Sequence, residues 1–108
     1  MTIQKWQKEV HQLAIEKGWW DKERAIGDIF ANFHAEISEA WEEHRKGLKP
    51  TDSYICEGKP EGMAIELADC IIRILDFCGK YNIDIEGAIE AKHNFIKTRP
   101  YRHGNKVA

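Results

Sequence analysis

The chain has 108 residues, enough for one domain whose core needs no disulfide or metal to fold. Its charged fraction of 31% and formal net charge of -2 are ordinary for a soluble globular protein. They give no reason to expect a nucleic-acid or membrane partner. The three cysteines form no CxxC pair, so neither a disulfide framework nor a thiolate zinc site is expected. The chain opens with no signal-peptide pattern and contains no apolar run of membrane-spanning length, so we expect a cytoplasmic protein.

Apolar periodicity predicts helices and no strand. The first helix runs from an N-cap at Thr2 to a stop at Gly18, and the second begins between Asp21 and Asp28 and ends at Gly47. The apolar stripe of the second helix recurs at three- and four-residue steps and is predicted to face the core. Its members are Ile26, Ile29, Phe30, Phe33, Ile37, Ala40 and Trp41.

Residues 48–60 contain prolines and a glycine and are predicted to form a loop. The third helix begins near Pro60 or Glu61 and ends near Gly79, and Pro60 would suit its first turn. The fourth runs from a cap at Asp84 to about Ile96.

These elements predict an all-α fold, an antiparallel four-helix bundle in a single domain over residues 1–98. Residues 99–108 form a basic C-terminal tail that follows the last helix. The third helix carries an apolar arc wider than one partner helix requires, and the small chain holds four tryptophans. Both features favour burial against a second subunit.

Two acidic doublets, Glu36-x-x-Glu39 and Glu66-x-x-Asp69, fall inside the second and third predicted helices. A spacing of three residues puts both carboxylates of a doublet on one face of its helix. Two such helices side by side would gather four carboxylates, the oxygen-only environment that Mg²⁺ prefers. The competing interpretation is a solvated helix face, on which Asp69 forms an ordinary ion pair with Arg73 one turn later.

The position of Glu36 favours the metal site. Glu36 lies at the edge of the apolar stripe, beside Phe33 and Ala40, where an ionised carboxylate is partly desolvated unless a cation compensates it. Glu36, Glu39 and Glu43 also stack like charges along one helix edge, which destabilises an isolated helix. A divalent cation would remove both costs, and Glu43 is a further candidate ligand.

The doublets and the loop between them resemble the ExxE…ExxD signature of the MazG-like nucleoside triphosphate pyrophosphohydrolases, all-α enzymes related to dimeric dUTPases and dCTP pyrophosphatases. The second doublet reads Glu-Leu-Ala-Asp at residues 66–69. The resemblance covers most of the chain. It includes Lys-Gly-Trp-Trp at residues 17–20, the segment 66–76, and Arg-Pro-Tyr-Arg-His-Gly at residues 99–104, which resemble the shorter, single-domain members.

The resemblance implies hydrolysis of a nucleoside triphosphate between the α and β phosphorus atoms, giving a nucleoside monophosphate and pyrophosphate, with a role in nucleotide-pool control. It implies that Glu36, Glu39, Glu66 and Asp69 are catalytic and hold Mg²⁺, with Mn²⁺ as the alternative ion. The ion would draw charge from phosphate oxygens and activate a water, and one carboxylate, such as Glu39, would orient that water as general base. A homo-oligomer, dimer or tetramer, is also implied.

Substrate-binding candidates come from the same resemblance. The family places a phosphate-binding lysine where this chain has Lys92, whereas its usual asparagine three residues before the arginine of the last motif is here Ile96. Trp19 and Trp20 could either stack on a nucleobase or pack against the adjoining helix. The basic residues near the C-terminus could either bind phosphate or belong to a solvated terminus. The candidates are Lys92, Asn94, Arg99, Tyr101, Arg102, Trp19 and Trp20, with Lys106 as a further base near the end.

Two other functions stay open. A non-catalytic helical interaction module would use the same acids only to solvate a helix face. A di-iron carboxylate bundle needs two Glu-x-x-His motifs, and the chain has only one, Glu90-x-x-His93, so this class is disfavoured.

Overall fold

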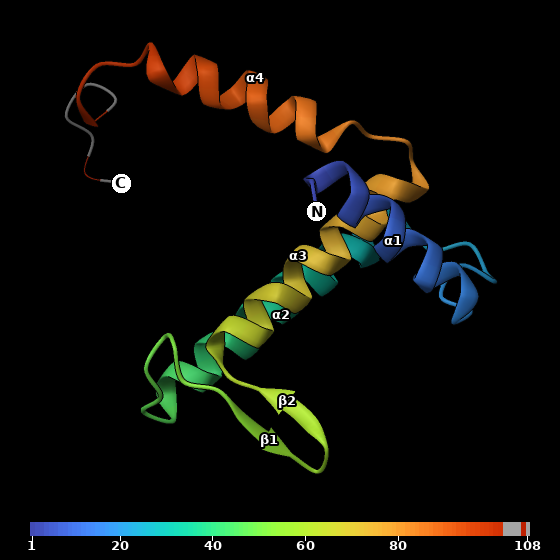
Figure 1. Ribbon diagram of the computed structural model, residues 1–108, viewed down its shortest axis with the longest axis vertical. Helices are drawn as coiled ribbons and strands as arrows, with labels where there is room; N and C mark the ends of the chain where they lie inside the picture. Colours follow the sequence, from blue (N-terminus) through green and yellow to red (C-terminus); the bar gives the residue numbers. More distant parts are fainter. Residues whose placement is uncertain (103–106, 108) are drawn as a thin grey trace.

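The computed structural model describes residues 1–102 and 107, and in them the chain folds into four helices and one short hairpin (Figure 1). All four predicted helices are confirmed, with bounds within a few residues of the predicted ones. None of the described helices is long and apolar enough to cross a membrane. The elements are α1 (Ile3–Glu16), α2 (Ile26–Arg45), β1 (Tyr54–Cys56), β2 (Lys59–Glu61), α3 (Met63–Lys80) and α4 (Ile85–Lys97).

The prediction that residues 48–60 contain no strand was wrong. Here β1 and β2 pair antiparallel, with Tyr54 opposite Glu61. Glu57 and Gly58 make the turn with positive φ of 52° and 78°, the conformation that suits the right-handed twist of a two-residue hairpin. Pro60 therefore lies in β2, and α3 begins at Met63, two or three residues later than the predicted start.

Two helices, α1 and α4, begin directly after the residues predicted to cap them. At α1 the Thr2 hydroxyl oxygen accepts the Lys5 backbone N–H at 3.1 Å. At α4 the Asp84 carboxylate accepts the Gly87 backbone N–H at 3.0 Å. Each contact satisfies a backbone donor that has no partner within its helix, which fixes where the helix starts.

The centre of the molecule is the antiparallel pair of α2 and α3, which run side by side along most of their length (Figure 1). Phe30 and Phe33 of α2 pack on Phe77 of α3 with ring centroids 5.2 Å and 6.2 Å apart. This pairing sets the register in which the two acidic doublets face each other. The buried apolar residues are Ile29, Ala40, Cys70, Leu75 and Cys78.

The first helix crosses the C-terminal part of α3 (Figure 1). His11 Nδ1 lies 2.8 Å from Asp76 Oδ1, and the two helices approach so closely that a Cβ on Gly79 would lie 2.5 Å from the His11 Cβ. A larger residue at position 79 would force α1 and α3 apart.

The fourth helix is directed away from the α2–α3 pair (Figure 1). It meets α1 near its own start, where the Gln4 backbone N–H donates to Glu86 at 3.4 Å. The single chain thus packs α1, α2 and α3 together and leaves α4 projecting. The bundle arrangement and a second subunit stay predictions.

Much of the predicted apolar stripe of α2 is uncovered. Ile29 and Ala40 are buried, whereas Ile37 and Trp41 are 51% and 56% exposed. The reason is that, among the described elements, α3 is the helix that runs beside α2 along this length, and one helix covers only one side of a broad stripe. The radius of gyration of 16.5 Å reflects the same openness, since a compact chain of this length has about 13 Å.

Candidate metal centre

Three carboxylates of the predicted set come together where α2 and α3 lie side by side. One oxygen each from Glu36, Glu39 and Glu66 lies within 4.8 Å of the others. Glu36 and Glu66 are only 6% and 5% exposed, whereas Glu39 is exposed. The cluster therefore has two buried donors at its base and one donor at its mouth, all of them oxygens, as a hard divalent cation requires.

Asp69, the fourth predicted ligand, lies at the edge of this cluster on α3. The Arg73 guanidinium links it to Glu36, because Arg73 Nε is 3.4 Å from Asp69 Oδ1 and 3.0 Å from Glu36 Oε1. The ion pair between Asp69 and Arg73 that the competing interpretation expects is present. The same arginine also reaches across to α2, which that interpretation did not include.

The two buried glutamates hold protons unusually strongly. Burial, a hydrogen bond with Asp69 and repulsion from neighbouring acids raise the pKa of Glu36 from 4.5 to about 7, although the charge of Arg73 opposes the rise. Burial, with hydrogen bonds to Glu61 and Glu39, also raises the pKa of Glu66 from 4.5 to about 7. Near neutral pH, a divalent cation binding here would therefore displace protons.

Glu36 Oε2 is buried, and among the described residues no donor group hydrogen-bonds to it. The contact between Glu36 and Asp69 is a hydrogen bond only while one of the two carboxyls carries a proton. A buried oxygen without a donor costs free energy that a cation would offset. The residues present thus fit a divalent metal ion.

A second group of acids adjoins the first and shares Glu66. One oxygen each from Glu43, Glu61 and Glu66 also lies within 4.8 Å of the others. Glu43 is buried and already satisfied, because its two oxygens accept the Tyr54 hydroxyl at 3.0 Å and Lys46 Nζ is 3.4 Å away. Glu43 therefore acts first as an anchor for the β1–β2 hairpin.

Glu61 is the site residue that sequence reasoning missed. It stands at the end of β2, and a hydrogen bond from Glu66, together with Lys59 Nζ at 3.4 Å, lowers its pKa. Its place beside Glu66 depends on the hairpin, which the sequence pattern did not predict. The only sequence signal for this hairpin was the Glu57-Gly58 pair, a weak match to the residue pairs that favour a two-residue turn.

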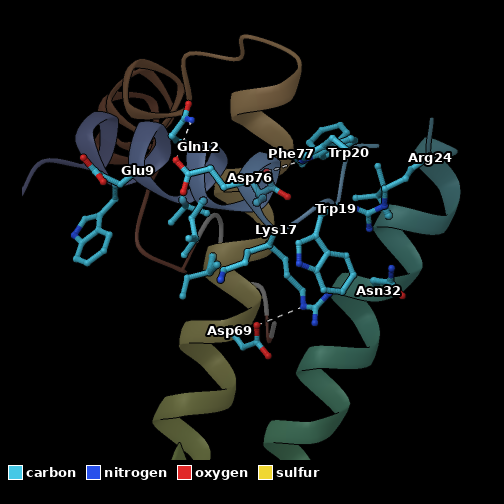
Figure 2. A pocket seen from close by; sticks show the side chains of 18 of the residues that line it. Glu9, Gln12, Lys17, Trp19, Trp20, Arg24, Asn32, Asp69, Asp76 and Phe77 are labelled. Atoms are coloured by element: carbon cyan, nitrogen blue, oxygen red, sulfur yellow. Dashed lines mark hydrogen bonds and ion pairs between the residues drawn. The ribbon is translucent and has the colours of Figure 1, made fainter. Parts of the chain in front are cut away.

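A cavity of about 590 Å³ opens beside the carboxylates, between α1, the segment after it, α2 and α3. Asp69 and Arg73 line both the cavity and the edge of the acidic cluster. Figure 2 shows Trp19 in this cavity, with Asn32 on the α2 side and Asp69 on the α3 side. A molecule in the cavity would thus contact an aromatic ring, an amide and the edge of the carboxylate cluster.

The two predicted tryptophans differ in how they are held. Trp20 Nε1 donates to Asp76 Oδ1 at 2.9 Å, and His11 Nδ1 lies 2.8 Å from the same oxygen, so a hydrogen bond holds Trp20 in place (Figure 2). The Arg24 guanidinium lies 4.9 Å from the centre of the Trp20 ring. Trp19 is 57% exposed, and its ring is the one available for stacking.

The basic candidates of the C-terminal part are not brought to the carboxylates by this chain, because α4 points away from them (Figure 1). Lys92 and Arg99 lie over the Phe95 ring at 5.4 Å and 5.0 Å, and Arg102 lies over Tyr101 at 5.7 Å. Asn94 and Ile96 of α4 are exposed, and so are the side chains just named, some of which follow the end of α4 at Lys97. His103, Gly104 and Lys106 lie outside the described residues.

Comparison of the chain with protein-family models, with curated proteins and with solved structures found no match. The resemblance to MazG-like enzymes therefore rests on the motifs alone. The grouping of the carboxylates in the structure does not depend on that resemblance.

Proposed function

We propose that this chain is a Mg²⁺-dependent nucleoside triphosphate pyrophosphohydrolase, with Mn²⁺ as the alternative ion. It would convert a nucleoside triphosphate to the monophosphate and pyrophosphate in the cytoplasm and so act on the nucleotide pool. One observation carries the proposal: Glu36, Glu39 and Glu66 converge within 4.8 Å, two of them buried, and a buried oxygen of Glu36 has no donor among the described residues. Such an arrangement is costly without a cation.

Each carboxylate has a distinct part in this proposal. Bound Mg²⁺ would supply charge neutralisation of phosphate oxygens and a lowered pKa of water. Glu36 and Glu66, buried in the α2–α3 contact, would hold the ion rigidly. Glu39, which is exposed at the mouth, would orient a water as general base. Asp69 would complete the donor set from one turn further along α3.

The cavity beside Asp69 is the proposed place for the nucleoside. The exposed Trp19 ring would stack on the base, an interaction worth roughly 1–3 kcal/mol. The Asn32 amide offers donors and an acceptor to the base edge. The triphosphate would then run from the cavity past Asp69 towards the carboxylates.

The proposal includes a homo-oligomer, a dimer or tetramer. The accessible surface of 8502 Å² for a 12.5 kDa chain is large, since a monomer of that mass has about 6200 Å². Ile37 and Trp41 of α2, with Leu67 and Ile71 of α3, are 42–57% exposed and would be covered by a second copy. A second copy is also a route by which basic residues of α4 would reach a phosphate.

A non-catalytic interaction module is the second candidate. The observation that favours it is Arg73, which already compensates Glu36 and Asp69. The di-iron class gains no support, because the acid clusters found among residues 1–102 and 107 contain only glutamates, and Glu90 and His93 are both exposed on α4.

A pyrophosphate-release assay over a panel of nucleoside and deoxynucleoside triphosphates tests the proposal. Wild-type protein should release pyrophosphate only with Mg²⁺ or Mn²⁺, and Glu39→Gln and Asp69→Asn should each lower kcat by about 100-fold or more. Glu90→Gln is the matched control, because Glu90 is exposed on α4 and belongs to neither acidic group. Full activity of both test variants would refute the four-carboxylate site.

A further inference from the structure

Arg73 is placed between the carboxylate cluster and the cavity. Its Nε lies 3.0 Å from Glu36 Oε1 on α2 and 3.4 Å from Asp69 Oδ1 on its own helix. Two of the four proposed metal ligands therefore share one side-chain cation. Arg73 also lines the cavity that holds Trp19.

The contact of Arg73 with Glu36 is an ion pair without a directed hydrogen bond. The Nε atom is buried, and no acceptor among the described residues lies in line with its N–H. A buried guanidinium donor that forms no hydrogen bond is poorly satisfied, so charge is the main attraction in this pair. The Arg73 side chain as a whole is 34% exposed, and it already lines the cavity.

We propose that Arg73 and a divalent cation are alternative counter-charges for Glu36 and Asp69, and that cation binding releases the guanidinium into the cavity to bind a phosphate of the substrate. The inference rests on the proposed function and adds a residue that couples metal binding to substrate binding. The planar guanidinium can bind two phosphate oxygens at once. The arginine then holds the substrate only after the metal is in place.

The charge of Arg73 predicts opposite changes in the affinities for Mg²⁺ and for phosphate when Arg73 is replaced. An arginine with a purely structural role would not give opposite changes. A positive charge within 3.4 Å of two ligands repels a divalent cation that uses the same oxygens. Removing the charge should therefore tighten Mg²⁺ binding, by about tenfold, and should weaken the binding of a phosphate chain by a similar factor. An arginine that only holds the carboxylates in position would, when removed, weaken both.

Isothermal titration calorimetry on the full chain tests the inference with two probes, Mg²⁺ alone and inorganic triphosphate at saturating Mg²⁺. Arg73→Gln should bind Mg²⁺ more tightly and inorganic triphosphate more weakly than the wild type. Arg45→Gln is the matched control and should change neither, because the Arg45 side chain is 59% exposed near the end of α2 and pairs with Glu42, which is not one of the proposed ligands. Circular dichroism melts establish that each variant is folded.

Weaker Mg²⁺ binding by Arg73→Gln, or unchanged triphosphate binding, would overturn the inference and leave the proposed function intact. Absence of Mg²⁺ binding by the wild type would overturn both. Should Arg73→Gln fail to fold, Arg73→Lys decides the question, because it keeps the charge and loses the fork. Arg73→Lys should bind Mg²⁺ as the wild type does and triphosphate more weakly, and weakened Mg²⁺ binding would contradict the inference.

Discussion

Replacing the buried Glu36 by glutamine should stabilise the metal-free protein and abolish its response to Mg²⁺. The carboxylate is 6% exposed, and one of its oxygens has no donor among the described residues. Glutamine has the same shape, carries no charge and can donate its own hydrogen bonds. The variant therefore removes a cost from the fold and a ligand from the site at the same time.

The size of the effect follows from the acidity of Glu36. Its pKa is raised from 4.5 to about 7, chiefly by burial. At about 1.4 kcal/mol per pKa unit, ionising Glu36 at pH 8 destabilises the fold by at most about 3 kcal/mol. This cost already includes the opposing attraction of Arg73. Because glutamine does not reproduce every contact of the protonated acid, we expect a net gain of about 1–2 kcal/mol, or roughly 4–15 °C in Tm. At pH 5 the folded protein already holds the proton, and only a small part of the gain should remain.

Thermal melts at pH 5 and pH 8, with and without Mg²⁺, measure both effects. Mg²⁺ at about 100 times its Kd should stabilise the wild type by about 2.7 kcal/mol and the variant very little, so the order of the two melting temperatures reverses. Glu90→Gln, on the exposed surface of α4, is the control and should stay within about 0.5 kcal/mol of the wild type. A Glu36→Gln protein that is less stable at pH 8, or that keeps the full Mg²⁺ response, would refute the reasoning.

Three further predictions concern pH, packing and assembly. The two buried glutamates, Glu36 and Glu66, have pKa values raised from 4.5 to about 7. Between these pH values the folded state therefore binds more protons than the unfolded state. The free energy of unfolding without metal should consequently fall as the pH rises from about 4.5 to about 7. Urea titrations across this pH range measure the free energy of unfolding, and a rise in stability with pH would contradict the prediction. Gly79→Ala should lower the free energy of unfolding by about 1–2 kcal/mol, because the new Cβ meets the His11 Cβ at 2.5 Å, whereas Gly27→Ala, with nothing within 4 Å, should be neutral or stabilising. Equal urea midpoints for these two variants would show that α1 does not pack closely on α3. Trp41→Arg should shift the protein from oligomer to monomer in light scattering after gel filtration, since Trp41 is 56% exposed on the α2 face assigned to a second copy. A wild-type monomer would contradict that assignment.

The helices could be predicted because their signals are local. The Thr2 and Asp84 caps and the three- and four-residue apolar steps act within one or two turns, and they locate the helices to within a few residues. The hairpin could not be predicted, because strands of three residues are too short to show alternation. The direction of α4 was also out of reach, since an apolar helix face can pair with its own chain or with a second copy.

The acidic cluster could be predicted in part. The edge position of Glu36 on the α2 stripe correctly indicated burial, and three of the four carboxylates do converge. The cross-helix pair between Arg73 and Glu36 and the approach of Glu61 to Glu66 depend on helix register and on the hairpin. Neither can be worked out from spacing along one helix.

The central claim is that α2 and α3 hold one divalent cation among their facing carboxylates. A crystal structure with Mn²⁺, using the anomalous signal of the ion, tests this most directly. We predict a peak about 2.1–2.2 Å from oxygens of Glu36, Glu39 and Glu66, with Asp69 completing the set and Arg73 withdrawn into the cavity. A structure in which Mn²⁺ binds elsewhere, or in which these carboxylates point into separate regions of solvent, would contradict the account.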